Sequence, residues 1–361
     1  MKQLLTIVIF LLFASTLAGQ EVVDKKKKII KEKKERLDHS GYNVSFIPLP
    51  YVNYNRSIGF MAGVAPMLQF SPLKNDTLSP LSTVGALGLY SANKSWGAAV
   101  FGLFYLKQDT WRIATGAGTG TLNFQFFLNL LNWWIPYDTD ADFFVFIINR
   151  KLIEHLYGGV SYTYVNLKTN FGDVPVDLET ALQSLGAQFR LDSRDNVYNP
   201  FRGTNSKVQF TMFPEWMGNE FVSRNIELEY NQYFPVRSYT DVLAARFYGG
   251  FGIGDISFNQ QFVVGGTDVR GYTQGKYRGN NQFALQAEYR WNPFKRTGFV
   301  GFAGVATVLE SVNDADNGKI LPGAGLGFRY VLLKETGIRV GLDFAVGQDD
   351  WGVYFRIGEA F

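Results

Sequence analysis

The sequence predicts an all-β protein that forms a closed, antiparallel transmembrane barrel of about 16 strands. The clearest evidence is the stretch 351–361. Its alternate positions are bulky and apolar, with Glu359 the exception, and the positions between them are small or polar. Because successive side chains of a strand point to opposite faces, one face of this strand suits lipid and the other suits a lumen.

The composition agrees with a barrel and excludes several other classes of protein. Aromatic residues make up 16% of the chain, only 19% is charged, and glycine occurs 38 times. Such a chain is too apolar to be disordered, and it lacks the run of about 18 apolar residues that spans a bilayer as a helix. Aromatic girdles at the two membrane interfaces account for the Phe, Tyr and Trp content. The absence of cysteine excludes a disulfide framework and a lipid-anchored cysteine.

The chain divides into three expected parts. Residues 1–19 are predicted to be a secretory signal peptide, because Lys2 precedes an apolar run, 4–13, and small residues follow. Residues 20–42 form a basic periplasmic arm, either a solvated tail or a segment that touches anionic lipid headgroups or an acidic partner. The net charge of +3 comes largely from this arm, so nucleic acid is not an expected partner. The barrel occupies residues 43–361 and lies in the bacterial outer membrane.

Period-two alternation between turn residues defines the strands. The predicted segments are 43–54, 58–70, 82–93, 95–107, 111–128, 142–153, 156–170, 181–193, 204–214, 220–236, 241–253, 281–293, 298–309, 323–334, 338–347 and 351–361. With a periplasmic arm, every second connection is a periplasmic turn. The long connections 129–141, 171–180, 254–280 and 310–322 then fall on the extracellular side, as expected of an outer-membrane barrel. The periplasmic connections 71–81 and 194–203 are longer than this rule predicts.

Charged side chains indicate which face of a strand is the lumen. Arg339 and Asp343 share one face of 338–347, and Glu288 and Arg290 share one face of 281–293. Turning an arginine toward lipid near the midplane costs about 2–4 kcal/mol. We therefore expect all four side chains to point into the lumen.

One motif identifies a family. The connection 254–280 contains Val269, Arg270, Gly271 and Tyr272 in succession, and the strand count makes it the sixth extracellular loop. Here the chain resembles the BamA/TamA superfamily of outer-membrane barrels, also called the bacterial surface antigen family, whose hallmark is this tetrapeptide at this position. The resemblance implies a barrel of sixteen strands with the sixth loop folded inward into the lumen.

Two further stretches extend the resemblance over most of 43–361. One resembles the family's periplasmic turn before the ninth strand, with Asp192, Arg194, Asp195, Pro200 and Gly203 at its motif positions. The other is similar to the family's terminal recognition strand, with the signal residues Tyr354, Phe355, Ile357 and Phe361. In this family the terminal strand is thought to be read by the cell's barrel-assembly machinery, which is thus an expected partner.

The loop-tip arginine needs lumen-facing acceptors, because a guanidinium carries five donors and stays charged. The resemblance makes Glu288 the first partner of Arg270. The family's second acid is absent, and Phe302 stands in its place. Asp343 is the candidate substitute, and Tyr272 is expected to pack on Phe302. The network either pins the loop and holds the barrel shut or takes part in moving a client.

The resemblance implies that the barrel assists insertion or translocation of a protein or lipid client at the outer membrane. The alternative is a passive solute pore or a structural barrel. The stretch between signal and first strand is too short for the family's periplasmic repeats, so the chain resembles a barrel-only branch. The proposed device is a weak seam between first and last strands, loosened by Gly352 and Gly358. No catalytic, metal or cofactor constellation is predicted, and His39 and His155 are the only histidines.

Overall fold

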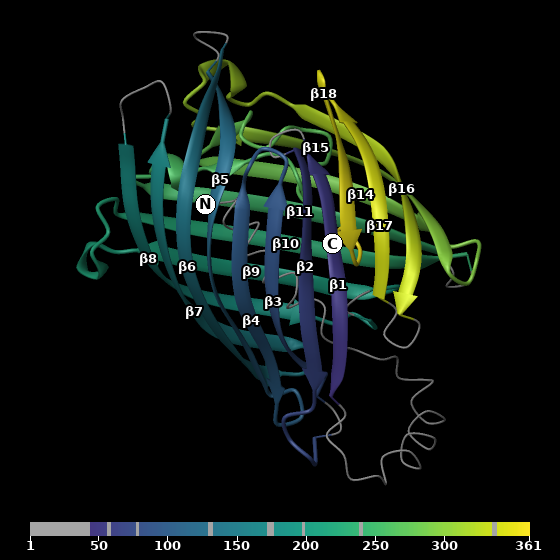
Figure 1. Cartoon of the computed structure of the whole chain (residues 1–361). Coiled ribbons are helices and arrows are strands. Elements are labelled where there is room, and N and C mark those ends of the chain that lie inside the picture. Colours follow the sequence, from purple (N-terminus) through teal and green to yellow (C-terminus); the bar gives the residue numbers. More distant parts are fainter. Residues whose placement is uncertain are drawn as a thin grey trace.

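The computed structural model describes residues 44–55, 59–76, 79–128, 133–171, 177–196, 199–237, 241–333 and 338–361. They form one antiparallel sheet of 16 strands, rolled into a barrel in which neighbours in sequence are neighbours in space (Figure 1). The predicted all-β barrel is confirmed. The predicted signal peptide 1–19 and basic arm 20–42 lie outside the described residues. No helix among the described residues is long and apolar enough to cross a membrane.

The barrel strands are β1 (Ser45–Asn55), β2 (Gly59–Phe70), β3 (Ser82–Ser91), β4 (Trp96–Leu106), β5 (Trp111–Leu128), β6 (Trp133–Ile153), β7 (Leu156–Asn170), β8 (Asp177–Asp192), β9 (Gly203–Phe213), β10 (Ser223–Val236), β11 (Asp241–Gly254), β14 (Asn281–Trp291), β15 (Thr297–Leu309), β16 (Leu321–Leu333), β17 (Ile338–Gly347) and β18 (Asp350–Ile357). Among the residues described, the connections carry a separate two-stranded hairpin and three short 3₁₀ turns. These are β12 (Phe262–Val263), β13 (Arg278–Gly279), η2 (Glu215–Met217), η3 (Phe258–Gln260) and η4 (Asp314–Asp316).

The sixth strand begins earlier than the sequence indicates. We expected a loop over 129–141 and a strand from 142, but β6 starts at Trp133 and pairs with β5 as far as Leu128. Asp140 and Asp142 are typical loop residues, yet both are exposed on the outer face of the strand. A strand that continues beyond the hydrocarbon meets water there, so outward-facing carboxylates are compatible with a strand at these positions. The same extension starts β8 at Asp177 rather than 181.

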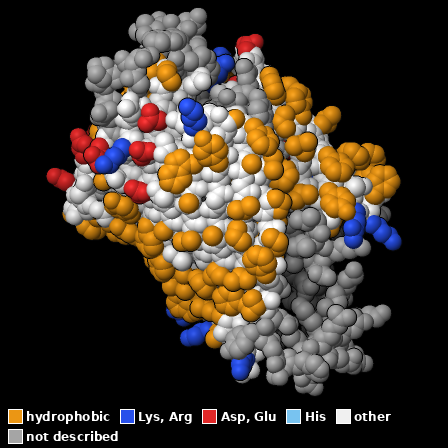
Figure 2. All heavy atoms as spheres, in the orientation of Figure 1, with side chains coloured by type: hydrophobic (Ala, Val, Ile, Leu, Met, Phe, Trp, Pro, Cys, Tyr) orange, Lys and Arg blue, Asp and Glu red, His pale blue; other side chains and the backbone are white. Residues whose placement is uncertain are grey.

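The outer face carries the predicted apolar band. Hydrophobic side chains cover much of the wall in Figure 2. Alternation is regular in β14, where Leu285 and Trp291 are exposed and Glu288 and Arg290 are wholly buried. A barrel that shows lipid its apolar side places charge inward, and the predicted lumen face of β14 is therefore correct.

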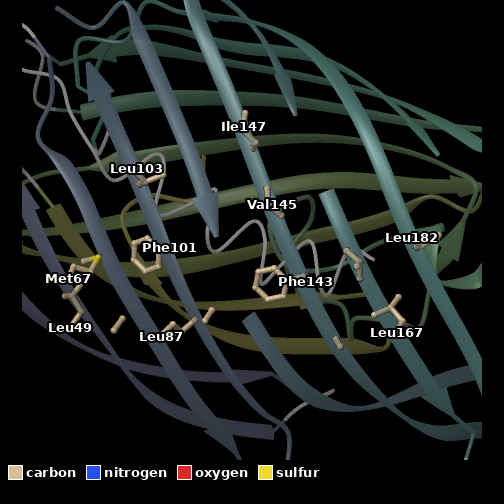
Figure 3. Packing of buried hydrophobic residues seen from close by; sticks show 14 of the residues in the cluster. Leu49, Met67, Leu87, Phe101, Leu103, Phe143, Val145, Ile147, Leu167 and Leu182 are labelled. Atoms are coloured by element: carbon tan, nitrogen blue, oxygen red, sulfur yellow. The ribbon is translucent and has the colours of Figure 1, made fainter. Parts of the chain in front are cut away.

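The inner face of the first half of the barrel differs from expectation. We expected small and polar residues toward the lumen, but β1 to β8 carry a continuous apolar cluster there (Figure 3). Its inward members include Leu49, Met67, Leu87, Phe101, Leu103, Phe143, Val145, Ile147, Leu167 and Leu182. Buried arginines and carboxylates are concentrated instead on β10 to β18, although buried polar side chains such as Gln69, Thr139 and Gln188 also lie on β2 to β8. The two halves of the wall therefore differ mainly in charge.

The barrel has a seam between its first and last strands. The edges of β1 and β18 lie next to each other, but no β-ladder joins them among the residues described. Strand β18 has 8 residues and β1 has 11, so part of the β1 edge extends past its neighbour.

Candidate functional site: the pinned lumen loop

The connection 255–280 between β11 and β14 folds back into the barrel. After η3, the hairpin β12–β13 brackets the motif segment, and Val263 pairs with Arg278 at its neck. Val264, Val269 and Tyr272 are 0%, 1% and 2% exposed. They pack with inner residues of β11, β14, β15 and β16. An extracellular loop would be solvated if it projected outward, so burial of this segment reflects the inward fold.

Arg270 lies at the centre of the site and is fully buried. Its Nη2 donates to Glu288 Oε2 on β14 at 2.7 Å, and its Nη1 donates to Asp343 Oδ2 on β17 at 2.6 Å. Gln286 Oε1 on β14 accepts from Nε and Nη2 at 3.3 and 3.2 Å. The loop tip is thereby bonded to two strands that are not neighbours. Such short charge-assisted bonds are the strong class of hydrogen bond.

Phe302 supplies a contact of another kind. The Cζ atom of Arg270 lies 3.3 Å from the centre of the Phe302 ring on β15. A buried guanidinium over an aromatic face gains about 2 kcal/mol or more. The aromatic residue that stands in the acid's place therefore still contacts the arginine, through its ring rather than through a carboxylate.

The ion pairs continue beyond the loop into a buried network. Asp343 also accepts from Arg329 and, at 2.8 Å, from Arg356. Glu288 accepts from Arg290 at 2.8 Å. Glu359 links the remaining members, accepting from Arg329 at 2.9 Å and from Arg339 at 3.2 Å. This lumen network comprises five arginines and three carboxylates, namely Arg270, Arg290, Arg329, Arg339, Arg356, Glu288, Asp343 and Glu359.

Gly271 fits where another residue would not. Its φ is +107°, and an added Cβ would lie 2.6 Å from the backbone of Val346 on β17. Its N–H donates to Tyr354 Oη on β18 at 2.9 Å. On the adjoining strand β16, a Cβ on Gly323 would collide with the Arg270 carbonyl oxygen. The missing side chains thus let the loop backbone lie directly against the wall.

Tyr272 packs on Tyr277 and not on Phe302 as expected. The rings of Tyr272 and Tyr277 meet edge to face with centroids 5.6 Å apart. The Tyr272 hydroxyl donates to the Pro322 carbonyl on β16 at 2.5 Å and accepts from Gln348 N at 3.1 Å. Burial raises the pKa of the Tyr272 phenol, and the Gln348 N–H lowers it in part. Arg270 covers the Phe302 ring, which leaves Tyr272 to fasten the loop elsewhere.

The turn motif before β9 forms a compact unit at the opposite end of the barrel. Asp192 accepts from Arg194 Nε at 2.8 Å and Nη2 at 3.0 Å, a bidentate pair that is nearly buried. Burial lowers the pKa of Arg194, but Asp192 raises it, and the net direction is upward. Asp195 Oδ1 accepts from Phe201 N at 3.0 Å. Pro200 is buried, and Gly203 has a φ of +103° with Ser193 O where its Cβ would lie.

The end of the chain departs from the predicted strand 351–361. Trp351 is exposed on the outer face and Tyr354 points inward, but β18 stops at Ile357. Gly358 has a φ of +86° and turns the chain inward. Glu359 is therefore in the lumen network, and Phe361 packs against the inner wall beside Tyr233 rather than facing lipid. The reason is electrostatic, since a carboxylate on the lipid side would have no arginine partners.

Sequence reasoning missed several members of the site. Gln286 shares the inward face of Glu288 two positions away, a parity signal that was available. Arg329 and Arg356 also alternate inward, and the register of β16 and β18 against β17 places each of them diagonally opposite Asp343. Within the described ranges, no group of three His, Cys, Asp or Glu side chains is arranged to hold a metal ion.

Comparisons with known proteins place the fold. The Omp85 superfamily domain matches residues 93–361. BamA from Haemophilus ducreyi, in a crystal structure lacking POTRA domains 1–3, is similar with a TM-score of 0.62 at 12% identity, covering 95% of this chain and 81% of that one. CdiB from Acinetobacter baumannii gives 0.61 at 14% identity, covering 88% of this chain and 60% of its own length. CdiB from Escherichia coli gives 0.59 at 14%, covering 90% and 68%. No curated protein matches in a sequence search.

Proposed function

This chain belongs to the Omp85 superfamily of outer-membrane barrels, as its BamA/TamA-like motifs predicted, and we propose that it assists insertion or translocation of a protein or lipid client. The observation that carries the proposal is the seam, where β1 and β18 meet without a ladder among the described residues. An unpaired strand edge inside a membrane is costly, because lipid offers no hydrogen-bond partner to its backbone N–H and C=O groups. A client strand that adds to the edge would supply those hydrogen bonds.

The sequence of β1 gives the weak seam a physical cause. Pro48 lies directly opposite Pro66 of β2, and the β2–β3 ladder is interrupted at Pro66. The carbonyl of Phe60, which has the same parity as Pro66, also points to the β3 side, where Ala92 N donates to it at 2.7 Å. The position of the missing N–H of Pro66 is therefore on the β3 side.

The orientation of Pro48 follows from that of Pro66. Opposed residues of an antiparallel pair either bond to each other or both point away. Pro48 thus faces away from β2, toward the seam, and Pro50 shares its parity. Of the five β1 residues whose backbone faces the seam (46, 48, 50, 52 and 54), two have no N–H to donate. These prolines supply a stronger reason for weak closure than Gly352 on β18 and Gly358 just after it.

The sixth loop contacts β18, the strand on the other side of the seam from β1, and these contacts support the proposed opening of the seam. Thr273 N donates to Asp350 Oδ2 on β18 at 2.7 Å, and Gly271 N bonds to Tyr354 on the same strand. With Arg270 tied to β14 and β17, the loop braces the strands leading to β18. The braced edge would stay in place while the proline-bearing edge opens. In this proposal the loop sets the lumen shape and no residue acts as a catalyst.

The alternative of a passive solute pore has one observation in its favour, a wall with charged inner residues on β9 to β18. Two observations oppose it. The sixth loop occupies the lumen, and the inner side of β1 to β8 is apolar. Hydrophobic constrictions resist wetting and so impede ions and small solutes.

The expected surroundings follow from the fold. Outer-membrane lipid contacts the apolar band, and we propose that the cell's barrel-assembly machinery inserts the chain by reading the region of Tyr354, Phe355, Ile357 and Phe361. The inward turn at Gly358 would then form after insertion, once Glu359 meets its arginines. A periplasmic position for the basic arm is part of the same proposal.

The experiment is a disulfide lock of the seam. The chain has no cysteine, so pairs can be introduced one on β1 and one on β18 and scanned along the edge. The matched control is Val52→Cys with Ala62→Cys, a directly opposed pair within the β1–β2 ladder. Locking the seam should abolish client insertion and reduction should restore it, whereas the control lock should leave insertion intact. Full activity with an oxidised seam would refute the gate.

A further inference from the structure

Strand β8 extends beyond β9, the strand that follows it. The β8–β9 ladder joins 185–192 to 205–212, so 177–184 continues past β9 at the end of the barrel where the sixth loop begins. On its other side the same stretch is paired with β7 as far as Asp177. Among the described residues, this part of the strand therefore has one unpaired border. The stretch 177–182 is called the β8 edge.

A side chain occupies the first position beyond β9. Gln183 N donates to Asn219 Oδ1 at 2.8 Å, and Asn219 Nδ2 donates to the Gln183 carbonyl at 2.9 Å. Gln183 Nε2 also donates to the Met217 carbonyl at 2.8 Å, which places the connection between β9 and β10 beside β8. Because alternate residues direct their backbone groups to the same side, those of Ala181 and Glu179 face this border too. They bond to no described residue there.

The β8 edge lies in water rather than in lipid. The Glu179 side chain is 65% exposed and pairs with Lys168 of β7 at 3.3 Å, and Asp140 and Asp142 are exposed on the outer face of β6. Acidic side chains gather over this part of the wall at the upper left of Figure 2. An unpaired border costs little in water, but it remains a template for another strand, and proteins usually cover it.

The opposite border of the same extension is covered. Strand β5 also continues beyond its neighbour β4, and there Asn123 N donates to Ser95 Oγ at 2.9 Å and the Asn123 carbonyl accepts from Asn93 Nδ2 at 2.8 Å. Farther along, the sixth loop lies against this border, since a Cβ on Gly275 would be 3.0 Å from the Gln125 carbonyl oxygen. Within the described ranges, the chain's own loop covers the β5 border and nothing covers the β8 edge.

We propose that the β8 edge binds an extended, basic segment of another protein by strand addition. Main-chain bonds to Glu179 and Ala181 give affinity, and the alternating side chains of the added strand give specificity. On the outer face that strand meets Glu179, and Glu215 and Glu220 are exposed on the adjoining connection, so lysine or arginine at alternate positions complements the site. A second copy of this chain fits less well, because pairing two β8 edges brings like charges together.

The variant that tests strand addition is Ala181→Pro. It removes one backbone N–H that bonds to no described residue, and proline is accepted on edge strands, so the fold should withstand it. Glu179→Lys tests the charge. Its control is Glu154→Lys, because the Glu154 side chain is 89% exposed at the opposite end of the barrel. Each full-length protein is purified in detergent, and its folding is verified by heat-modifiable gel mobility.

The probe is a fluorescently labelled peptide of eight residues in which lysine and valine alternate. One comparison peptide has glutamate in place of lysine, and another is methylated at every amide nitrogen. Anisotropy titration should show saturable binding of the lysine peptide, weaker by about fivefold or more in Ala181→Pro and Glu179→Lys and unchanged in Glu154→Lys. The two comparison peptides should not bind.

Three outcomes overturn the proposal. They are the absence of saturable binding by the lysine peptide, equal binding by the methylated or the glutamate peptide, and unchanged affinity in Ala181→Pro. Self-association that Ala181→Pro abolishes, without peptide binding, would assign the β8 edge to a second copy of the chain instead. The readout involves neither the seam nor client insertion, so failure here leaves the proposed function untouched.

Discussion

At the scale of single residues, the contacts of Arg270 fix the position of the sixth loop in the lumen. Two carboxylates, one amide and one aromatic ring contact its guanidinium, and none of its side chain is exposed. Lysine has one point charge and cannot reproduce the planar fork that reaches β14 and β17 together. The arginine of the family motif is thus also a residue whose contacts require its planar guanidinium.

We predict that Arg270→Met destabilises the barrel by about 3–5 kcal/mol, because it leaves Glu288 and Asp343 short of a buried partner. Urea unfolding followed by tryptophan fluorescence in detergent measures the change. Arg237→Met serves as the control, since the Arg237 side chain is 66% exposed beside Asp241 and such a pair contributes about 0–1 kcal/mol. Equal midpoints for the two variants would contradict a pinning role for Arg270.

Another residue-scale prediction concerns Phe302. Replacing it with leucine keeps an apolar side chain but removes the ring face under Arg270, so we expect a loss of about 2 kcal/mol. The control is Phe299→Leu on the outer face of the same strand, where the ring contacts the aromatic rings of Trp291 and Phe328. Unfolding midpoints compare the two. A loss no larger at Phe302 than at Phe299 would show that the cation contact adds nothing.

At the scale of elements, β1 carries the proline-bearing edge on which the proposed gate depends. We predict that Pro48→Val with Pro50→Val closes the seam more firmly, because it restores two N–H donors on that edge. Each hydrogen bond gained is worth about 0.5–1.5 kcal/mol, so the barrel should become more stable and client insertion slower. Insertion of a radiolabelled client into proteoliposomes measures the rate.

Pro66→Val is the matched control for the seam. It makes the same substitution at the residue opposite Pro48, but the restored donor faces β3, inside the sheet. The control should gain stability without slowing insertion. If Pro66→Val slows client insertion as much as the Pro48→Val, Pro50→Val double variant does, the slowing does not depend on the seam.

The last strand is the element in which prediction and structure differ most. The alternation that predicted 351–361 persists only to Ile357, after which Gly358 turns the chain. We expect Gly358→Ala to strain the positive-φ turn by about 1–3 kcal/mol and loosen Glu359 from Arg329 and Arg339. The unfolding midpoint should fall, with Gly88→Ala as comparison, because an added Cβ at that strand position meets nothing within 4 Å. An effect at 358 no larger than the effect at 88 would argue against a constrained turn.

At the scale of the whole molecule, the barrel has two unlike halves. β1 to β8 carry apolar side chains inward, whereas β10 to β18 hold the lumen network and the sixth loop. The charged half is cross-linked through the loop, and among the described residues no β-ladder joins the apolar half to it across the seam, although Phe355 of β18 packs against the apolar cluster. The two halves therefore meet at β1 and β18 through side chains.

The loop in the lumen and the apolar inner cluster together predict the ion conductance of the barrel. In planar bilayers the intact barrel should show no large, stable conductance, because the loop fills the lumen on one side and apolar residues line the other. Deletion of 265–276 removes the loop interior while keeping β12 and β13, and it should produce larger openings. Steady solute-selective conductance of the intact protein would favour the pore.

The sequence by itself determined the all-β class, the strand number, the inward face of β14 and the loop that carries Arg270. Each of these depends on local alternation, which a strand imposes at every second residue. It also indicated Glu288 and Asp343 as lumen-facing acids. It could not give the extension of β6, because outward aspartates occur both in a loop and in a strand above the lipid.

Only the tertiary structure decided which inward residues meet. Asp343 gathers Arg270, Arg329 and Arg356, and Glu359 leaves the lipid face that its parity assigned. Arg329 and Arg356 reach Asp343 through the register of the two strands beside β17, whereas Arg270 reaches it from a loop 73 residues away and Glu359 reaches its arginines through one positive-φ glycine. Alternation assigns a side of the wall, but strand register and the inward fold of the loop select the partner, because neither is encoded in the spacing along a single strand.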